Sequence, residues 1–598
     1  MTLTELEFEL LVALVEPHSG SDAPARPSVE ELAAACAVSL ESTQACYEHL
    51  CSEGLVEESA LTADGLAALE PYRVDNAVIM AAGPSSRLAP ISYERPKALM
   101  KARGEVLIER QIEQLYEAGI TDVTVVVGYM KEQLFYLEDK LGVRIKVNEA
   151  FADRNNHASL MAVRERLGNT YICSSDNYFI ENVFRRYEYR AYYAATHLEG
   201  RTSEYCARLD EAGRIVGIDS GGEDADVLMG HAYFDRSFSH AFVDVLKCVY
   251  DDLSTAPKLW DDIFADHAAE LPLYARFYRP GVIHEFDTLD DLRSFDPDFL
   301  DNVDSAIMEN ICATLGCGRA DISGIVPIKQ GLTNLSCKFE VGGKPYVYRH
   351  PGPGTDAIIS RESETYSQQV AAELGIDKSF IYEDPEQGWK ISRFIEVTEP
   401  FDFHNVDHMR RAMAMARTLH RSGAKSAWAF DIHEDTKKQM ALLGDRQRIM
   451  FADFDELYAL AERLNEVVVR GSGEPVLCHN DFYDPNFLIE GDDMHLIDWE
   501  YSGMSDFMSD IGVFICCADH TYEEALRVLE TYFERELTDE ELLHCLASIS
   551  VISFHWFIWA LYEDTHGQPV GELLYLWYKY TKFYGQKALE LQERLESK

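Results

Sequence analysis

The chain has 598 residues, 47% of them hydrophobic, and a formal net charge of −49. This length predicts three or four domains, and the negative charge, which is spread along the whole chain, disfavours binding to nucleic acid or anionic membranes. Thirteen cysteines without a Cys-x-x-Cys pair indicate reduced thiols, and the N-terminus has no secretory signal pattern, so we expect a cytoplasmic protein. The longest largely apolar run, Ile549–Tyr562, contains a histidine and is too short to cross a bilayer.

Residues 1–73 are predicted to form a small helical domain. Three helices are expected, over Leu3–Val15, after a Ser28 N-cap, and from Leu40. This order resembles a winged helix-turn-helix domain. DNA binding by such a domain needs Lys and Arg on the recognition helix, whereas the first 72 residues contain one arginine and no lysine against fourteen acidic side chains. We therefore predict a structural or protein-contact role.

Residues 74–300 alternate between apolar strands and helical segments. The first strand, from Asn76, runs into the loop Ala81-Ala82-Gly83, which is followed by Arg87 and Lys97. Backbone amides of such a loop can cradle phosphate groups, and the two basic side chains can neutralise them. We predict a nucleotide-binding site at this loop.

The string Ala-Ala-Gly-x3-Arg-Leu, followed by Pro-Lys-Ala-Leu, resembles the nucleotidyltransferases that couple a phosphorylated metabolite to a nucleoside triphosphate with release of pyrophosphate. Three further buried strands are predicted, over Val123–Gly128, Leu141–Asn148 and Thr170–Ser174. Alternating β and α segments predict a doubly wound, Rossmann-like, mostly parallel sheet. Its ligands should lie at the carboxyl ends of the strands.

Two aspartates of this region are candidates for a metal site. Asp176 follows the fourth strand, where the resemblance implies a catalytic Mg²⁺, and Asp287 lies in a segment that is similar to the family's closing strand. Within the family, Asn155–Leu160 and Ala212–Ile215 are similar to the bacterial phosphocholine cytidylyltransferases, which implies CTP and phosphocholine as substrates. Aromatic side chains that can enclose a trimethylammonium group are Tyr178, Tyr193, Tyr205, Trp260 and Phe286.

Residues 305–598 contain a second, different set of polar residues. Asp481, Asn486 and Asp498 occur in the order and spacing of a phosphoryl-transfer site. One carboxylate must accept the proton of an attacking hydroxyl, and an amide oxygen and a second carboxylate must hold the Mg²⁺ that bridges the ATP phosphates. The apolar stretch Met494–Ile497 predicts a strand that delivers Asp498. We predict a kinase active site here.

This region resembles the choline/ethanolamine kinases and aminoglycoside phosphotransferases, which implies a bilobal, protein-kinase-like fold and ATP as the phosphate donor. The resemblance implies a turn over the phosphates that comprises Gly331, Thr333 and Asn334. It also implies that Arg349 is the base that binds the phosphates and that Glu364 is its ion-pair partner. Protein kinases have lysine at this position, whereas choline kinases often have arginine, so the resemblance implies a small-alcohol substrate.

The C-terminal segments are rich in aromatic residues. Trp556 and Trp559 are three positions apart and so share one helical face, as in the Trp-x-x-Trp pair of choline kinases. Aromatic faces suit a quaternary ammonium group, which cannot donate a hydrogen bond. The family pattern has an acidic residue where this chain has Cys516-Cys517, and we expect Glu500 or Asp519 to replace it. The choice between choline and ethanolamine therefore stays open.

The two predicted sites catalyse consecutive steps. ATP-dependent phosphorylation of choline yields phosphocholine, and cytidylyl transfer from CTP then gives CDP-choline and pyrophosphate. One alternative is the same architecture acting on ethanolamine or on an aminophosphonate. Another is a metabolite-sensing transcriptional regulator, although a sensor would not need the metal and base ligands that are present. A homo-oligomer is compatible with the sequence, which does not indicate an oligomeric state.

Overall fold

The computed structural model describes residues 3–15, 27–328, 334–352, 360–443, 450–565 and 570–598. It divides into two compact units, Met1–Met308 and Glu309–Lys598. The division falls within α12 (Ala306–Leu315), the helix that leads from one unit into the other. Each unit is described by itself.

The first unit begins with a small helical region. The elements are α1 (Glu5–Val15), α2 (Val29–Ala35), α3 (Leu40–Ser52), the hairpin strands β1 (Val56–Glu57) and β2 (Ala60–Leu61), and α4 (Ala63–Leu69). The three predicted helices are therefore confirmed. Ser28 caps α2 as expected, because its side chain accepts a hydrogen bond from the Glu31 amide and the Glu31 carboxylate accepts one from Ser28. The winged-helix assignment stays a prediction.

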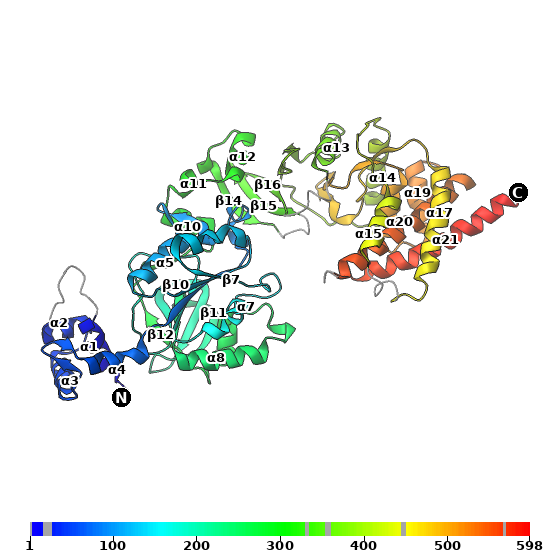
Figure 1. Cartoon of the computed structure of the whole chain (residues 1–598). Coiled ribbons are helices and arrows are strands. Elements are labelled where there is room, and N and C mark those ends of the chain that lie inside the picture. Colours follow the sequence, from blue (N-terminus) through cyan, green and yellow to red (C-terminus); the bar gives the residue numbers. More distant parts are fainter. Residues whose placement is uncertain (1–2, 16–26, 329–333, 353–359, 444–449, 566–569) are drawn as a thin grey trace. The chain divides into compact units, whose positions relative to one another are not determined.

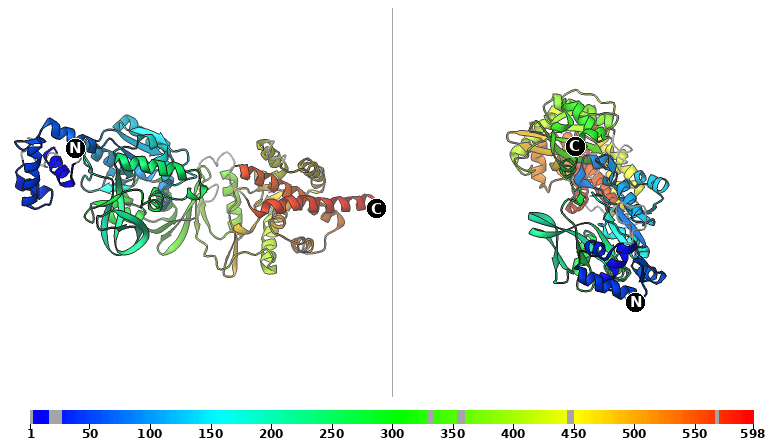
Figure 2. Two further views of the ribbon diagram at one scale, coloured as in Figure 1. Left: turned by 90° about the horizontal axis from the view of Figure 1, so that it is seen from below. Right: turned by 90° about the vertical axis from the view of Figure 1, so that its left-hand side faces the viewer.

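This helical region packs directly against the next part of the same unit. The Phe8 ring lies 5.2 Å from Tyr72 and 5.4 Å from Tyr189, measured between centroids. The Arg185 guanidinium binds the Glu9 carboxylate with both nitrogens, at 3.1 and 2.9 Å. The helices, blue in Figures 1 and 2, therefore lie beside the body of the unit and share an apolar cluster with it.

The body of the first unit is built on a seven-stranded sheet in the order β12-β10-β11-β8-β3-β6-β7. Its strands are β3 (Asn76–Ala81), β6 (Val123–Val127), β7 (Arg144–Val147), β8 (Thr170–Ser174), β10 (Tyr192–Leu209), β11 (Ile215–Phe234) and β12 (Tyr274–Phe277). The four predicted strands are present and run parallel. Not predicted was the long hairpin of β10 and β11, whose 18 and 20 residues pair antiparallel and also place β11 antiparallel to β8.

Helices and two short ladders complete this unit. The helices are α5 (Leu107–Glu117), α6 (Tyr136–Leu141), α7 (His157–Ala162), α8 (Arg236–Val249), α9 (Trp260–Asp266), α10 (Leu289–Phe295) and α11 (Phe299–Asn302). The ladders pair β4 (Lys101–Ala102) with β5 (Glu105–Val106), and β9 (Asn177–Phe179) with β13 (Ile283–Glu285). Pairing of β9 with β13 places the distal end of this unit beside the carboxyl end of β8.

The second unit has a sheet lobe and a helical lobe. The sheet has the order β14-β15-β16-β18-β17, with β14 (Ile322–Pro327), β15 (Asn334–Val341), β16 (Lys344–Pro351), β17 (Phe380–Glu383) and β18 (Lys390–Arg393). All its pairings are antiparallel, and α13 (Arg361–Glu373) belongs to the same lobe. This is the two-lobed arrangement that the sequence predicts.

The helical lobe contains the long helices of the chain and two short ladders. Its helices are α14 (Val406–His420), α15 (Ile432–Leu442), α17 (Phe454–Gly471), α18 (Met508–Cys516), α19 (Tyr522–Phe533), α20 (Asp539–Thr565) and α21 (Glu572–Glu596). The ladders pair β19 (Val476–Cys478) with β22 (Gly503–Ser505), and β20 (Phe487–Glu490) with β21 (Asp493–Leu496). Helices α20 and α21 lie side by side (Figure 1).

Helix α20 is the one helix in the described ranges that is long and apolar enough to cross a membrane. It has 27 residues, more than the apolar run that the sequence shows, because polar turns extend the helix at both ends. However, 78% of its apolar window is buried inside the helical lobe. Such burial is what a core helix of a folded domain requires.

Candidate active sites

The first site lies at the carboxyl end of β3. The loop after this strand and the residues near Lys97 line a cavity of about 680 Å³, which includes the predicted Ala81, Ala82, Gly83, Arg87 and Lys97. A Cβ added to Gly83 would meet no protein atom within 4 Å, so the loop backbone borders open space. The structure therefore brings the predicted phosphate-binding loop and both predicted bases to one cavity.

Three carboxylates meet at the edge of this cavity. Asp176 follows β8, whereas Glu285 and Asp287 lie at the end of β13 and just beyond it, and one ligand atom of each lies within 4.8 Å of the others. Lys97 contacts one oxygen of Asp176, and Arg87 pairs with Asp287 at 3.0 Å. The second buried oxygen of Asp176 has no hydrogen-bond partner among the described residues.

The electrostatics of this cluster suit a divalent cation. Burial, and then the charges of Asp176 and Asp287, raise the pKa of Glu285 to about 8. Three crowded carboxylates with an unsatisfied buried oxygen fit a hard cation, which prefers oxygen ligands. Asp176 and Asp287 were predicted as a pair, but Glu285 was missed. The available signal was the spacing in Glu285-Phe286-Asp287, because residues two apart on a strand point to the same face.

A second cavity, of about 330 Å³, adjoins the first and shares Lys97, Arg87 and Asp287 with it. Its other end is aromatic and acidic. The Tyr193 hydroxyl donates to Asp261 at 2.8 Å, and the Tyr193 ring lies 5.0 Å from Trp260. The remaining lining residues that bear on its chemistry are Asp176, Tyr205, Asp261 and Glu285.

Two of the aromatic residues proposed from the sequence lie elsewhere. The Tyr178 hydroxyl donates to Glu105 at 2.5 Å, and its ring lies under the Arg110 guanidinium, outside both cavities. Phe286 is buried against Phe295. Phe286 alternates with Glu285 and Asp287, which line the second cavity, so its side chain points to the opposite side. Tyr193, Tyr205 and Trp260 are the aromatic residues that the structure gathers.

The predicted kinase triad is brought together in the second unit. Asn486 donates its amide nitrogen to the Asp481 carboxylate at 2.9 Å, which leaves its oxygen as the atom available to a cation. Burial, and then the charge of Asp498, raise the pKa of Asp481 to about 8. Asp498 follows β21 with φ of +66°, so its backbone turns sharply where the strand ends. The charge of Asp498 therefore acts on Asp481, and the Asn486 side chain lies beside the Asp481 carboxylate.

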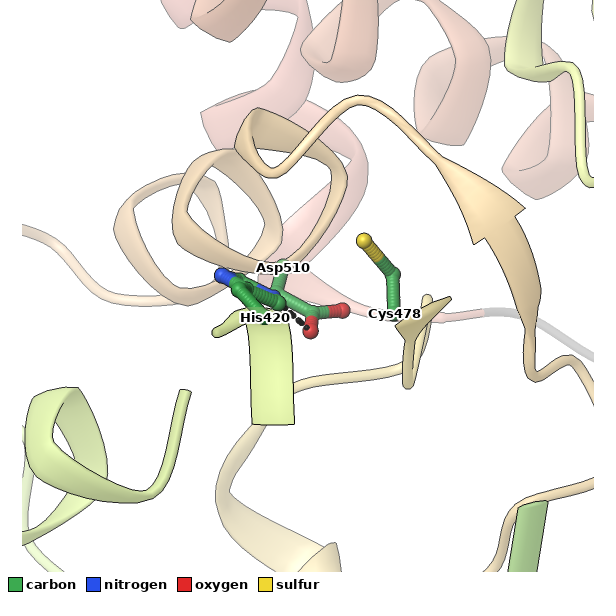
Figure 3. A group of neighbouring side chains, drawn as sticks. All are labelled: His420, Cys478 and Asp510. Atoms are coloured by element: carbon green, nitrogen blue, oxygen red, sulfur yellow. Dashed lines mark hydrogen bonds and ion pairs between the residues drawn. The ribbon is translucent and has the colours of Figure 1, made fainter. Parts of the chain in front are cut away.

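A buried aspartate holds the loop that carries Asp481. Asp510 accepts hydrogen bonds from the backbone amides of His479 and Asn480, at 3.0 and 2.7 Å, and from His420 Nε2 at 2.9 Å. Figure 3 shows Asp510 and His420 with Cys478 alongside. The three side chains are close enough together to hold a metal ion. Both oxygens of Asp510 are already used, however, and the Cys478 thiol donates to the Asp506 carbonyl at 3.4 Å. Asp510 therefore fixes the backbone of the loop through hydrogen bonds.

The predicted ion pair of the sheet lobe is present. Arg349 Nη1 lies 2.5 Å from Glu364 and 3.6 Å from Asp498, and Arg349 Nη2 lies 3.1 Å from Glu383. Lys390, the cross-strand neighbour of Arg349, lies 3.6 Å from Glu364. Glu383 and Lys390 were not predicted, because their proximity depends on the strand register.

Other predicted kinase residues occupy two sides of the site. Gly331 and Thr333 lie outside the described residues. Asn334 donates to Glu500 at 3.0 Å, so Glu500 lies near the Arg349 side. Asp519, the other acid named from the sequence, pairs on the surface with Lys579 at 3.3 Å.

Trp556 and Trp559, which the sequence predicts to share one helical face, lie together, and Trp577 from the following aromatic segment joins them. The rings of Trp556 and Trp559 on α20 are 5.5 Å apart, and Trp577 of α21 lies 5.8 Å from Trp556. Burial, and then the charge of Asp481, raise the pKa of the Tyr483 phenol.

Comparison with known proteins assigns both units. The MobA-like NTP transferase domain matches residues 77–197, and the Phosphotransferase enzyme family (APH) matches residues 324–547. The choline-phosphate cytidylyltransferase of Streptococcus pneumoniae is 34% identical over 220 residues, which are 37% of this chain and 96% of that protein. The chain belongs to this cytidylyltransferase family. It joins a nucleotidyltransferase domain to a phosphotransferase domain.

Two further proteins are each similar to one domain. The 2-aminoethylphosphonate cytidylyltransferase of Lancefieldella rimae is also 34% identical to the transferase domain, over 225 residues that are 37% of this chain and 92% of that protein. The crystal structure of choline kinase LicA from Streptococcus pneumoniae is similar to the phosphotransferase domain. Its sequence identity is 23% and its TM-score 0.38, and the match covers 48% of this chain and 96% of that chain.

Proposed function

We propose that this protein converts choline to CDP-choline in two steps, one in each domain. The phosphotransferase domain would phosphorylate choline with ATP, and the transferase domain would join phosphocholine to CTP and release pyrophosphate. The observation that carries this proposal is the pair of adjoining cavities in the transferase domain, which meet at Lys97 and Asp287. One is large and lined by the phosphate-binding loop, and the other ends in aromatic and acidic side chains. Both steps would take place in the cytoplasm, where ATP and CTP are available.

In the transferase domain, the charges support the attack of a phosphocholine oxygen on the α-phosphate of CTP. This step brings two anions together, and Lys97 and Arg87 offset part of the repulsion. Asp176, Glu285 and Asp287 would hold Mg²⁺, which supplies further positive charge when bound. Lys97 contacts Asp176 and lines both cavities, which supports its proposed role at the point of phosphate transfer.

In the phosphotransferase domain, Asp481 accepts the proton of the choline hydroxyl as its oxygen attacks the γ-phosphate of ATP. Burial supports this role, because a pKa near neutrality suits a general base. Asn486 and Asp498 would hold Mg²⁺, which would supply positive charge at the ATP phosphates. Arg349 supplies a positive charge that Glu364 orients.

Two alternative substrates have specific support. The relative that acts on 2-aminoethylphosphonate is as similar as the one named for choline phosphate, and ethanolamine differs from choline only in its methyl groups. The aromatic faces of Tyr193 and Trp260, whose rings are tilted by 31° to each other, favour a quaternary ammonium group, because π faces attract a cation. Asp261 could instead accept hydrogen bonds from a primary ammonium group. We favour choline on the aromatic evidence.

The full-length protein should be assayed for each step separately. Choline and ethanolamine are supplied with ATP and Mg²⁺, whereas phosphocholine, phosphoethanolamine and 2-aminoethylphosphonate are supplied with CTP and Mg²⁺. Products are identified by mass. We expect phosphocholine from the first set and CDP-choline from the second, each at the highest kcat/KM of its set. Cytidylyl transfer to the aminophosphonate but not to phosphocholine would contradict the proposal.

A further inference from the structure

The helical lobe contains a half-buried carboxylate beside a buried histidine. Asp435 lies in the first turn of α15, its side chain is 33% exposed, and it accepts a hydrogen bond from Gln439 at 2.9 Å. Within the described ranges, no lysine or arginine forms an ion pair with it. A carboxylate that is partly removed from water and left without a counter-ion costs free energy, which a cationic ligand would reduce.

The neighbouring histidine does not compensate this charge. His555 Nε2 lies 4.0 Å from the Asp435 carboxylate, but burial lowers the pKa of His555 to about 3, so the ring is neutral. The Thr436 hydroxyl donates to the Ile432 carbonyl at 2.6 Å, so at 2.9 Å it must accept from His555 Nδ1. The His555 proton is therefore on Nδ1, and Nε2 turns a lone pair toward Asp435.

Asp435 lies between the catalytic loop and the tryptophan cluster. The segment that leads into α15 lies beside the catalytic loop, because the Phe430 amide donates to the Met504 carbonyl of β22 at 3.0 Å, and β22 pairs with β19, the strand that ends just before His479. On the other side, the ring of His555 lies 5.2 Å from that of Trp556. An amino-alcohol with its hydroxyl at Asp481 would thus have its ammonium end near Asp435.

The other acidic candidates are engaged elsewhere. Glu500 accepts from Asn334 on the Arg349 side of the site, and Asp519 pairs with Lys579. Cys517 contributes no charge, because hydrogen bonding with Cys516 and burial raise the pKa of its thiol. We propose that Asp435 faces the ammonium group of the substrate in the phosphotransferase domain and so determines its selectivity for cationic alcohols. This inference rests on the proposed function of that domain.

The test compares a charged alcohol with an uncharged alcohol of the same shape. In the full-length protein, Asp435→Asn should raise KM for choline about tenfold, as expected for the loss of one partly screened charge pair, and leave kcat within twofold. KM for 3,3-dimethylbutan-1-ol, which has carbon in place of the ammonium nitrogen, should not change. The matched control is Asp519→Asn, which should leave both KM values unchanged.

Each result separates the inference from the proposed function. An unchanged KM for choline in Asp435→Asn would overturn the inference, because it would show that Asp435 does not interact with the substrate. An equal rise in KM for both alcohols would also overturn it, because it would show a change in the shape of the site and not the loss of a charge. Asp435→Glu, which keeps the charge, should keep part of the selectivity for choline. This variant provides the test if the asparagine variant is unstable. Failure of the wild-type protein to phosphorylate choline or ethanolamine would instead overturn the proposed function.

Discussion

Asp510 gives the sharpest prediction, because it positions the catalytic loop without touching a reacting atom. One of its oxygens accepts from the His479 amide and from His420, and the other accepts from the Asn480 amide. Asp510→Asn keeps the shape of the side chain but replaces one acceptor oxygen with a donor. At least one of these hydrogen bonds is then lost, and two donors face each other.

The magnitude follows from the contacts. A hydrogen bond to a charged group contributes about 1.5–3 kcal/mol, and an unsatisfied buried amide adds a similar cost. If about 3 kcal/mol of this appears as lost positioning of Asp481, which is one residue beyond Asn480, kcat for the phosphotransferase falls by about 10²-fold. KM for ATP should change little, because the Arg349 cluster is not involved.

The transferase activity of the same chain is an internal control. A coupled assay measures ADP formation, and pyrophosphate release measures cytidylyl transfer, which should keep its wild-type rate. Asp506→Asn is the matched control, since among the described residues this side chain accepts from the Met508 amide at 2.9 Å and lies 3.2 Å from His544 Nε2, neither of which belongs to the catalytic loop. A wild-type kcat for Asp510→Asn would refute the positioning argument, and so would an equal loss in the Asp506 variant.

Three further predictions concern the two active sites and the N-terminal region. Asp481→Asn should lower choline phosphorylation by about 10³-fold while CDP-choline synthesis from supplied phosphocholine persists; loss of both activities in a folded variant would contradict the two-site division. Asp176→Ala and Asp287→Ala should each lower cytidylyl transfer by about 10³-fold and let phosphocholine accumulate, whereas Asp290→Ala should not; a wild-type rate for Asp287→Ala would show a wrong ligand assignment. Fluorescence anisotropy with duplex DNA at physiological salt should show no saturable binding, and salt-sensitive sub-micromolar affinity would revive a regulatory role.

Much of each site could be predicted because its residues are close in sequence. The loop at Ala81–Gly83 directly follows β3, and the hairpin of β20 and β21 joins Asp481 to Asp498, so the local chain largely decides their geometry. The ion pair of Arg349 with Glu364 was accessible only through the family resemblance. Within these segments, strand ends were predicted to within a few residues, because apolar runs mark buried strands.

Residues that are far apart in sequence could not be paired in this way. Glu285 joins Asp176 because β13 pairs with β9, and no local pattern predicts that ladder. Tyr178 was proposed as a ligand contact, but its ring lies under Arg110 and its hydroxyl donates to Glu105, two residues that are far from it in sequence. Asp435 lies more than one hundred residues from Trp556, and His555, the basic side chain 4.0 Å from it, is neutral because it is buried.

The sequence by itself determined the kind of chemistry: two phosphate sites of different design, two sets of oxygen ligands, and an aromatic helix in an acidic chain. These properties depend on residue type and on spacing along one strand, loop or helix turn. Tertiary structure alone decided which carboxylates share a site, which aromatic faces border a cavity and which charges are left without a partner. The physical reason is that desolvation and Coulomb interaction depend on distance in space, and chain folding sets that distance for residues that the sequence keeps far apart.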